Sequence, residues 1–295
     1  MPLSAKLYLP NSCANNFVDC WLKFKKLISS LHKNGIEVIL DVVYNHTAEG
    51  GSGGKVYNFK AMDENTFYIK NKNNIFVNFS GCGNTLNCNH KVVKDMIIQS
   101  LLYWYLETGV DGFRFDLASV LGRDSNGQWA KHSLLHELIE HPILSHAKLI
   151  AESWDLGGYF VGAMPSGWSE WNGAYRDTVR QFIRGDFNQV PELIKRIFGS
   201  VDIFHANKNG YQSSINFICC HDGFTMWDLV SYNSKHNLLN GENNQDGDNN
   251  NHSYNHGEEG LTHNLQIISL RKQQIKNMLL ILYISQGCLL YTSPS

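Results

Sequence analysis

Two charged residues stand inside an apolar stretch at GVDGFRFDLA, residues 109 to 118. In an extended strand, residues i and i+2 point to the same face, so Arg114 and Asp116 lie together, and the flanking phenylalanines form the other face. An arginine beside a carboxyl group favours the ionised form and lowers the carboxyl pKa. We therefore expect Asp116 to be an anion, a state that suits a nucleophile better than an acid.

A second carboxyl group, Glu152, has a different setting. It follows the apolar run KLIA and precedes Ser153 and Trp154. Apolar surroundings disfavour ionisation and raise a carboxyl pKa toward the value that a general acid requires. Two carboxyl groups with pKa values moved in opposite directions are typical of retaining glycoside hydrolysis, in which one attacks the anomeric carbon and the other protonates the leaving oxygen. In that reaction the two groups lie roughly 5 to 5.5 Å apart.

A structural role is the alternative for these charges. Buried Arg–Asp pairs also fix folds, and a glutamate at a strand end can cap a neighbouring helix. Polar residues stand at the ends of four separate apolar segments, which favours a functional site over a purely structural role. In chain order these residues are Asp41, Asn45 and His46, then Arg114 and Asp116, then Glu152 and Asp155, and finally His221 and Asp222.

Each of the four apolar segments follows an amphipathic stretch with helical spacing. The segments are IEVILDVVYNH (36–46), GVDGFRFDLA (109–118), AKLIAESWD (147–155) and SSINFICCHDGF (213–224). Helices are expected from Phe17 to Leu31, at HKVVKDMIIQSLLYWYLETG (90–109), from His132 to His141, and at QVPELIKRIFGS, where Pro191 stands in the first turn. Helix followed by strand, four times, predicts a parallel α/β fold.

An open doubly wound sheet and a closed (β/α)8 barrel are both parallel α/β architectures. An open sheet that binds nucleotides usually has a glycine-rich turn after its first strand. The run GGSGGK at 50–55 lacks the phosphate-loop spacing and the Ser or Thr after the lysine. In a barrel, catalytic residues come from the carboxyl ends of several strands that face one mouth, which matches the four segments here. The pattern favours an α/β fold of the (β/α)8 TIM barrel type.

The composition is that of a globular protein and excludes several classes. The 295 residues are 43% hydrophobic, and 25 basic against 27 acidic residues, without a basic block, argue against a nucleic-acid partner. The apolar run at 278–284 is far short of the roughly 20 residues of a membrane span, and residues 1–30 lack a signal core, so a cytoplasmic location without a membrane partner is expected. The seven cysteines are irregularly spaced, which predicts reduced thiols and no metal site. We expect no other cofactor either.

Four motifs resemble the signature regions of the α-amylase clan of glycoside hydrolases, in order. They are DVVYNH (41–46), GFRFDLA (112–118), AESWD (151–155) and CCHDGF (219–224). Within the clan, the stretches 76–90 and 221–260 are similar to isoamylase-type and bacterial glycogen debranching enzymes. The resemblance covers about residues 17–287. It implies retaining hydrolysis of α-1,6 branch linkages in glycogen, amylopectin or limit dextrins, in the cytoplasm or, for a plant or algal parent, the plastid.

The resemblance also implies a role for individual residues. Asp116 would be the nucleophile, Glu152 the general acid/base and Asp222 the carboxylate that stabilises the transition state. The implied contacts to the sugar at the cleavage point are Asp41, His46, Arg114 and His221. Candidates for stacking on sugar rings are Trp154, Trp168, Trp171 and Trp227, although aromatic residues near strand ends more often belong to the core. The Asn-rich stretch 240–256 would be an ordered wall of the cleft.

Both ends of the chain depart from the clan's pattern. Clan barrels have two strands before the segment at 36–46 and an eighth after the SQG that ends at Gly287, so we expect strands three to seven only. Residues 1–14 do not match, 15–287 would be an incomplete catalytic barrel domain, and CLLYTSPS at 288–295 resembles a translated sequencing adapter and is excluded from the expected fold. Such a fragment would expose sheet edges and apolar interior, so we expect it to aggregate or stay partly unfolded when expressed alone. A monodisperse preparation that melts cooperatively would contradict this expectation.

Three functions from different classes fit the resemblance. A debranching hydrolase is favoured for the full-length parent, because all three carboxylates are present. A noncatalytic glucan-binding regulatory subunit would usually lack one of them. A branching or other transglycosylating enzyme shares the same machinery, and the isoamylase-like stretch 221–260 argues against it.

Overall fold

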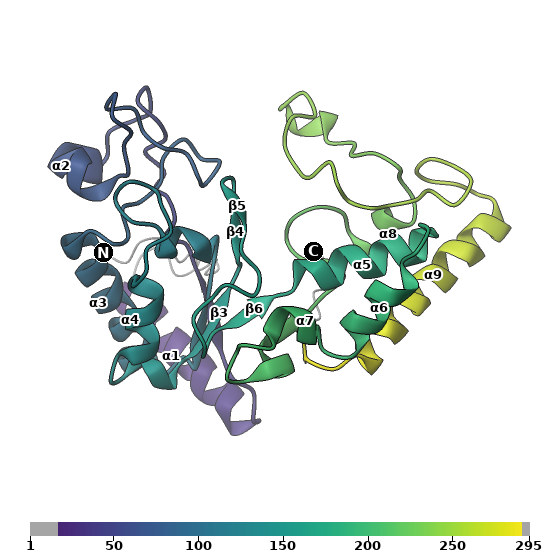
Figure 1. Ribbon diagram of the computed structural model, residues 1–295, viewed down its shortest axis with the longest axis horizontal. Coiled ribbons are helices and arrows are strands. Elements are labelled where there is room, and N and C mark those ends of the chain that lie inside the picture. The colour runs from purple at the N-terminus through teal and green to yellow at the C-terminus, as the bar shows by residue number, and fades with distance from the viewer. Residues whose placement is uncertain (1–16, 291–295) are drawn as a thin grey trace. The chain divides into compact units, whose positions relative to one another are not determined.

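A computed structural model of the chain describes residues 17–290 (Figure 1). The chain divides into two compact units, Met1–Glu170 and Trp171–Ser295. The nonmatching segment 1–14 and the end of the expected adapter tail, 291–295, lie outside the described residues.

A parallel sheet forms the centre of the first unit. Its strands are β1 (Ile39–Val42), β2 (Gly112–Phe115), β3 (Lys148–Ala151) and β6 (Ser169–Trp171), the last of which leads into the second unit. Each strand pairs in parallel with the next along the chain, with Asp41 opposite Arg114 and Arg114 opposite Ile150. Neighbouring parallel strands in chain order are typical of repeated strand–helix units, so the parallel α/β prediction is confirmed.

Helices fill the connections between these strands. They are α1 (Phe17–Lys33), α2 (Phe59–Phe67), α3 (Lys91–Thr108) and α4 (Leu134–Glu140), with the short 3₁₀ helices η2 (Ala118–Gly122) and η3 (Leu144–His146). The helices α1, α3 and α4 lie together beside the sheet (Figure 1). Gly109 ends α3 with a φ of 78°, and a Cβ on Gly112 would stand only 2.3 Å from the Lys148 carbonyl oxygen. The two glycines thus allow the turn into β2 and its close approach to β3.

The core of the first unit lies between the helices and the sheet. Phe113 and Phe115 are fully buried, as the alternation in the sequence predicts. The rings of Phe115 and Trp168 make an edge-on contact, with their centroids 5.1 Å apart. Trp168 is itself fully buried and donates its Nε1–H to the Leu135 carbonyl over 3.0 Å. Its candidacy for sugar stacking is therefore wrong, because the ring is a core side chain whose polar atom is already paired. Trp171 is buried as well, and its candidacy for sugar stacking stays a prediction.

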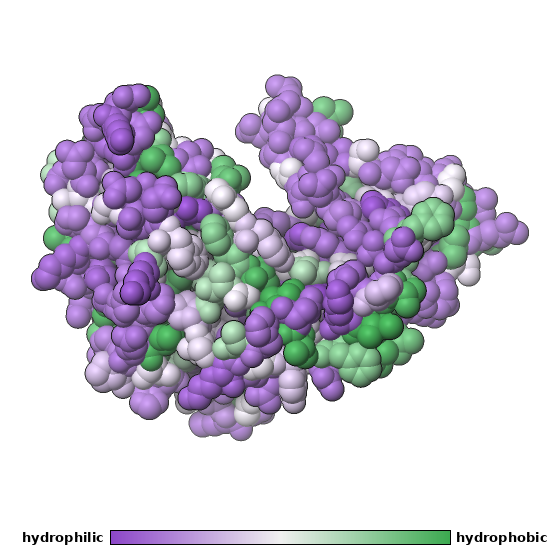
Figure 2. Space-filling model, viewed as in Figure 1, coloured by the Kyte–Doolittle hydropathy of each residue, from purple (hydrophilic) through white to green (hydrophobic). Residues whose placement is uncertain are grey.

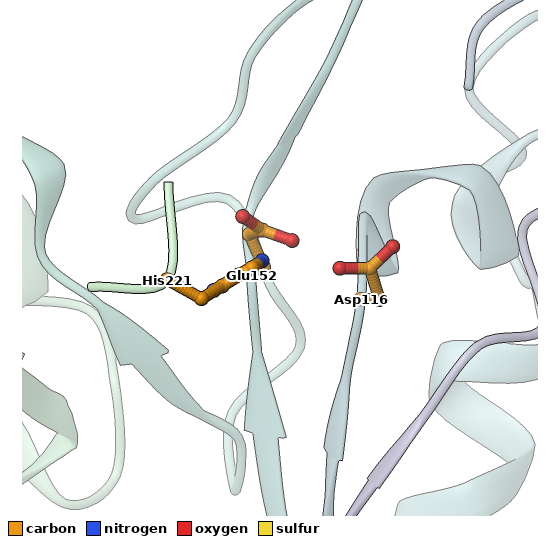
Figure 3. Close-up of side chains that lie close together, drawn as sticks. All are labelled: Asp116, Glu152 and His221. Atoms are coloured by element: carbon orange, nitrogen blue, oxygen red, sulfur yellow. The ribbon is translucent and has the colours of Figure 1, made fainter. Parts of the chain in front are cut away.

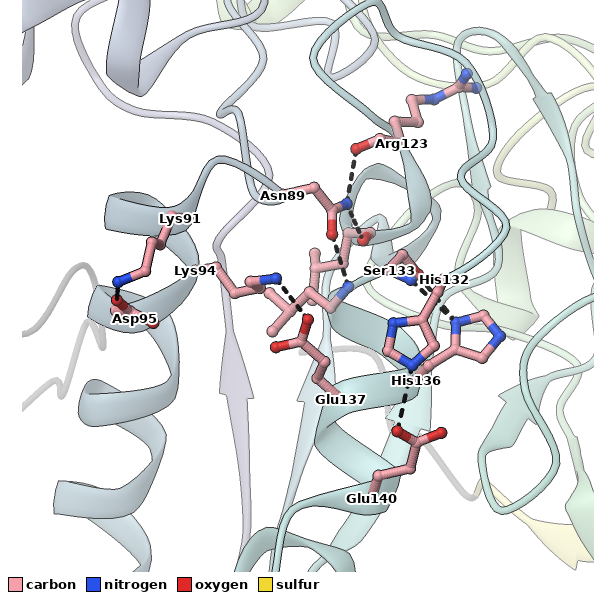
Figure 4. Close-up of polar contacts among 12 residues, drawn as sticks. Asn89, Lys91, Lys94, Asp95, Arg123, His132, Ser133, His136, Glu137 and Glu140 are labelled. Atoms are coloured by element: carbon pink, nitrogen blue, oxygen red, sulfur yellow. Dashed lines mark hydrogen bonds and ion pairs between the residues drawn. The ribbon is translucent and has the colours of Figure 1, made fainter.

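Polar contacts fix α4 against the segment that follows β2 (Figure 4). Asn89 donates to the carbonyls of Leu121 and Arg123 and accepts a hydrogen bond from the Leu134 backbone N–H at the start of α4. Ser133 and His136 form a capping box at the same helix end. The η2 turn, which comes directly after Asp116, is thereby tied to two helices.

The second unit is mainly helical. Its elements are α5 (Gly173–Arg184), α6 (Val190–Ile197), α7 (Val201–Phe204), η4 (Gly210–Ser213), β7 (Ser214–Asn216), α8 (Met226–Leu229), η5 (Leu238–Asn240), α9 (Leu265–Ile284) and β8 (Cys288–Leu289). Pro191 lies in the first turn of α6, as predicted. Apolar surface gathers over α6 and α9 in Figure 2, where Val190, Ile194 and Leu280 are exposed. No helix within residues 17–290 is long and apolar enough to span a membrane.

The Asn-rich stretch of the second unit has a defined conformation. The Lys235 ammonium donates to the carbonyls of Gln245, Asp246 and Gly247 at 2.9 to 3.3 Å. The fully buried Arg271 donates to the carbonyls of Asn255 and Gly260. The charged side chains of Lys235 and Arg271, each surrounded by backbone carbonyl oxygens, therefore order this loop. The expectation that the loop forms a wall of the cleft stays a prediction.

The strands differ from expectation at three places. β3 ends at Ala151, and Trp154–Asp155 instead form β4, which pairs antiparallel with β5 (Gly158–Tyr159). β6 has no counterpart among the four predicted segments, because SEW lacks an apolar run. Within the stretch 288–295, which was excluded from the expected fold, Cys288–Leu289 form β8, which pairs in parallel with β7 through Ile215 and Cys288. A short apolar segment satisfies the open backbone groups of an edge strand whatever its origin.

Truncating the core beneath the charged face should destabilise the first unit. In a full-length protein that carries this sequence, Phe113→Ala should lower the free energy of unfolding by about 3–5 kcal/mol, because it leaves a cavity among fully buried side chains. Urea unfolding followed by circular dichroism measures this. Leu106→Ala, at a residue 60% exposed on α3, is the matched control and should change little. Equal effects of the two variants would contradict the assignment of Phe113 to the core.

Candidate active site

A buried arginine joins the ends of three strands. Arg114 Nη1 lies 2.9 Å from Asp41 Oδ1 and 3.0 Å from Asp116 Oδ1, and its Nη2 lies 2.8 Å from Glu152 Oε2. Asp41 lies within β1, and Asp116 and Glu152 come directly after β2 and β3. The three carboxyl groups lie on the face of the sheet opposite the phenylalanines. Burial alone would lower the pKa of Arg114, but Glu152 and then Asp41 raise it, so the guanidinium stays charged.

Asp116 is held by donors on more than one side. Asn45 Nδ2 donates to its Oδ2 over 2.8 Å and to its backbone carbonyl over 2.9 Å. Burial raises the pKa of Asp116, but the Arg114 charge and the hydrogen bond from Asn45 outweigh it and bring the pKa below its ordinary value. This direction agrees with the expectation that Asp116 is an anion. His46 contacts the Asn45 side chain through Nδ1, and burial lowers its pKa although Asp116 opposes this.

Glu152 has the opposite protonation preference. Its side chain is almost entirely buried, and burial raises its pKa to about 8 against the effect of Arg114, with Asp116 adding to the rise. The carboxyl groups of Asp116 and Glu152 face one another (Figure 3), and their oxygens approach within 4.8 Å. At neutral pH the pair therefore consists of an anion beside an acid.

The turn after Asp116 is strained and contacts Glu152. Leu117 has a φ of 41°, in the left-handed region that residues with a Cβ rarely adopt. In this conformation its backbone N–H donates to Glu152 Oε2 over 2.9 Å, and the next N–H, of Ala118, donates to the Glu152 carbonyl over 2.8 Å. The left-handed conformation of Leu117 thus directs two backbone N–H groups at Glu152.

Trp154 lies on the β4–β5 hairpin that follows Glu152. It is half-buried, and its ring is nearly parallel to that of Tyr159, with centroids 6.0 Å apart. The hairpin is anchored by Asp155, whose buried carboxylate pairs with Arg123 at 2.7 and 2.8 Å and accepts from Ser119. Arg123 lies 32 positions away from Asp155 in the sequence, and no local pattern identifies such a pair.

His221 and Asp222 belong to the second unit. Both are exposed, and they follow β7 after a buried Cys219–Cys220 pair. The His221 ring lies 5.8 Å from that of Trp171, and its Nε2 lies 3.6 Å from Asp222 Oδ1. The first unit thus brings together Asp41, His46, Arg114, Asp116 and Glu152, with Trp154 on the adjoining hairpin.

The raised pKa of Glu152 should depend on Asp116. In Asp116→Asn the negative charge that favours the proton on Glu152 is removed and Arg114 has one partner fewer, so the pKa of Glu152 should fall from about 8 toward its ordinary value. A titration of the glutamate side-chain carboxyl carbons by NMR measures this in a full-length protein that carries the sequence. Asp95→Asn, on the surface of α3, is the control. A Glu152 titration unchanged near pH 8 would contradict the coupling.

Comparisons with known proteins give relatives over most of the chain. No family model matches it. The chain is 46% identical to isoamylase SU1 of Zea mays over 289 residues, covering 90% of this chain and 36% of the relative. It is 47% identical over 269 residues to a GlgX homologue, a glycogen operon protein of Mycobacterium tuberculosis, covering 90% of this chain and 37% of the relative. The chain thus spans about a third of the length of the curated relatives it matches.

The fold is also found among solved structures. A pullulanase from Anoxybacillus sp. LM18-11, crystallised with maltotetraose, matches with a TM-score of 0.63 and 26% identity, covering 91% of this chain and 35% of that one. Together with the two curated relatives, this confirms the resemblance predicted from the four motifs. Over 90% of its length, the chain is homologous to isoamylases and to GlgX proteins.

Proposed function

We propose that a full-length protein carrying this sequence hydrolyses α-1,6 branch linkages in glycogen, amylopectin or their limit dextrins, with retention at the anomeric carbon. The observation that carries the proposal is the Asp116–Glu152 pair, two neighbouring carboxyl groups whose pKa values move in opposite directions. The relatives named isoamylase and glycogen operon protein, and a structural neighbour crystallised with maltotetraose, support an α-glucan as the substrate.

Each carboxyl group has one role in a double displacement. The Asp116 carboxylate attacks the anomeric carbon, while Glu152 transfers its proton to the oxygen of the leaving chain. The Glu152 carboxylate formed in this step then removes a proton from water, which attacks the same carbon and releases Asp116. Arg114 and Asn45 hold Asp116 ionised and oriented, so little reorganisation is needed as charge develops.

The remaining site residues are assigned to the substrate. Asp222 supplies a fixed anion that stabilises the oxocarbenium-like transition state, without becoming covalent. Asp41, His46, Arg114 and His221 surround the sugar at the cleavage point, and Trp154 offers an aromatic face to a neighbouring glucose unit. No metal or cofactor takes part in these steps.

We assign the fold to part of a (β/α)8 barrel. The strands β1, β2, β3, β6 and β7 would be the third to seventh of that barrel, and residues 15–287 would belong to its catalytic domain. The support is the parallel pairing of the first four in chain order and the similarity to the pullulanase. A cytoplasmic location, or a plastid for a plant or algal source, fits relatives that include a protein named chloroplastic.

Removing either carboxyl group should strongly impair debranching. With branched glucan as substrate, Glu152→Gln should lower the rate by about 10²- to 10⁴-fold, the usual contribution of a general acid, and Asp116→Ala should release no linear chains while still binding glucan. Chromatography of the released chains and NMR of the α-1,6 anomeric signal measure this. Glu140→Gln, at the exposed end of α4, is the control. Transfer of branches by the wild type would indicate a transglycosylase, and binding without turnover a noncatalytic subunit; either contradicts the proposal.

The rate should depend on pH through the same pair. Glu152 must carry a proton to act as acid, so kcat/KM should fall as pH rises above about 8, the pKa of that group. Asp116 must be ionised, and Arg114 and Asn45 bring its pKa below the ordinary aspartate value, so the acidic limb should lie below that ordinary value. These apparent values belong to the coupled pair. A pH profile of kcat/KM measures both limbs, and an alkaline limb that persists in the residual activity of Glu152→Gln would contradict the assignment.

A further inference from the structure

A buried ion pair holds the hairpin that carries Trp154. The Asp155 side chain is completely buried and that of Arg123 nearly so. Nε and Nη2 of Arg123 donate to the two carboxylate oxygens of Asp155 over 2.8 and 2.7 Å. The fully buried Ser119 hydroxyl, from η2, donates to one of the same oxygens over 2.7 Å. The proposed reaction uses neither charge, so the cost of burying this pair needs another explanation.

The hairpin is too short to keep its conformation alone. β4 and β5 have two residues each, and an isolated two-stranded hairpin is at best marginally stable in water. Trp154 stands opposite Tyr159, and Asp155 stands opposite Gly158. The Asp155 carboxylate also accepts the Gly157 N–H over 2.7 Å, so it joins the turn of the hairpin to its first strand. The conformation of the hairpin therefore depends on what holds Asp155.

Arg123 connects the hairpin to two other segments of the first unit. Its Nη1 donates to the Gly127 carbonyl over 2.7 Å, and its guanidinium carbon lies 3.8 Å from the centroid of the Phe79 ring. The Phe79 carbonyl in turn accepts the Leu156 N–H of the hairpin over 2.9 Å. A Cβ on Gly157 would stand only 2.6 Å from Arg123 Nη2, so the turn packs directly on the guanidinium. Arg123 thus contacts residues from all three connections between β1, β2, β3 and β6.

The Trp154 ring depends on this arrangement. Trp154 directly precedes Asp155, and its ring is inclined by 6° to that of Tyr159, which is 53% exposed. Residues that stand directly opposite one another in an antiparallel pair share one face of it, so both rings lie on one side of the hairpin. An aromatic face that is fixed before a sugar arrives binds more tightly, because less freedom is lost on binding. A shift of the Asp155 carboxylate would move the adjoining Trp154 backbone, and the ring with it.

We propose that the Arg123–Asp155 pair is a positioning pair for glucan binding: by fixing the β4–β5 hairpin, it holds the Trp154 ring where a glucose unit of the substrate stacks on it. The inference rests on the proposed contact of Trp154 with the substrate. The pair itself does not contact the glucan. Its geometry matters as well as its charge, because lysine in place of Arg123 would keep the positive charge but lose the planar fork that meets both carboxylate oxygens.

The test is a double-mutant cycle of Arg123→Lys and Trp154→Ala in a full-length protein that carries the sequence. Each single change should raise KM for branched glucan about tenfold, the size of one aromatic stacking contact, and leave kcat within about twofold. In the double variant KM should rise no further than in Trp154→Ala alone, because the pair acts through that ring.

Arg184→Lys is the matched control. Arg184 also meets a carboxylate, that of Asp186, through Nε and Nη2, but it belongs to α5 of the second unit. The same loss of a guanidinium fork should leave KM and kcat unchanged there.

Two further measurements do not depend on turnover. In protein labelled with fluorotryptophan, the fluorine NMR signal of Trp154, identified by its loss in Trp154→Phe, should shift or broaden in Arg123→Lys and stay unchanged in Arg184→Lys. The calorimetric Kd for maltotetraose should rise in Arg123→Lys by about the same factor as KM. If the wild type cleaves no α-1,6 linkage, the proposed function fails, while these two measurements still test the positioning.

Several results would overturn the inference. One is a KM in the double variant that equals the product of the two single effects, because the pair and the ring would then act independently. Another is a loss of kcat at unchanged KM in Arg123→Lys, and a third is a Trp154 signal identical to that of the wild type. If Arg123→Lys does not fold, Ser119→Ala takes its place in the cycle. That variant removes one hydrogen bond to Asp155 and leaves the ion pair, so a smaller effect in the same direction is expected.

Discussion

The site depends on a single buried cation. A guanidinium taken out of water costs several kcal/mol unless carboxylates surround it with good geometry. Arg114 meets this condition only because β1, β2 and β3 bring Asp41, Asp116 and Glu152 to one place. The register of the sheet, with Asp41 opposite Arg114, is therefore a requirement of the electrostatics as well as of the core. A slip of one residue would turn the arginine toward the phenylalanine face.

One positive charge cannot keep three neighbouring carboxyl groups ionised with equal ease. Asp116 has the Asn45 amide as a further donor and keeps its charge. Glu152 is more deeply buried and has the negative Asp116 beside it, so it keeps a proton at neutral pH. The different roles of nucleophile and acid therefore follow from unequal solvation and unequal hydrogen bonding around a shared cation.

Local patterns predicted much of this arrangement. The two-residue period placed Arg114 with Asp116, and helical spacing predicted α1, α3, α4 and α6, because both signals depend on neighbours in the sequence. Tertiary packing decided the rest. Trp168 looks like a candidate for sugar stacking until its ring is found in the core, and the Asp155–Arg123 pair joins residues with no common pattern. Glu170, a fully buried acid on β6, has no signal in the sequence for the same reason, since SEW indicates neither a strand nor a buried acid.

The same cluster would be a poor choice if stability were its purpose. Replacing a buried ion cluster with well-packed apolar side chains is often neutral or stabilising, so the charges of Arg114 and its partners do not need to be explained by folding. The left-handed backbone at Leu117 adds strain of order 1–3 kcal/mol, and this conformation directs the Leu117 N–H at the Glu152 carboxyl group. Buried charge, a proton held near pH 8 and local strain meet within a few residues. Destabilising features of this kind are expected to cluster at a functional site. Their presence together distinguishes this cluster from an ion pair that only joins two strands.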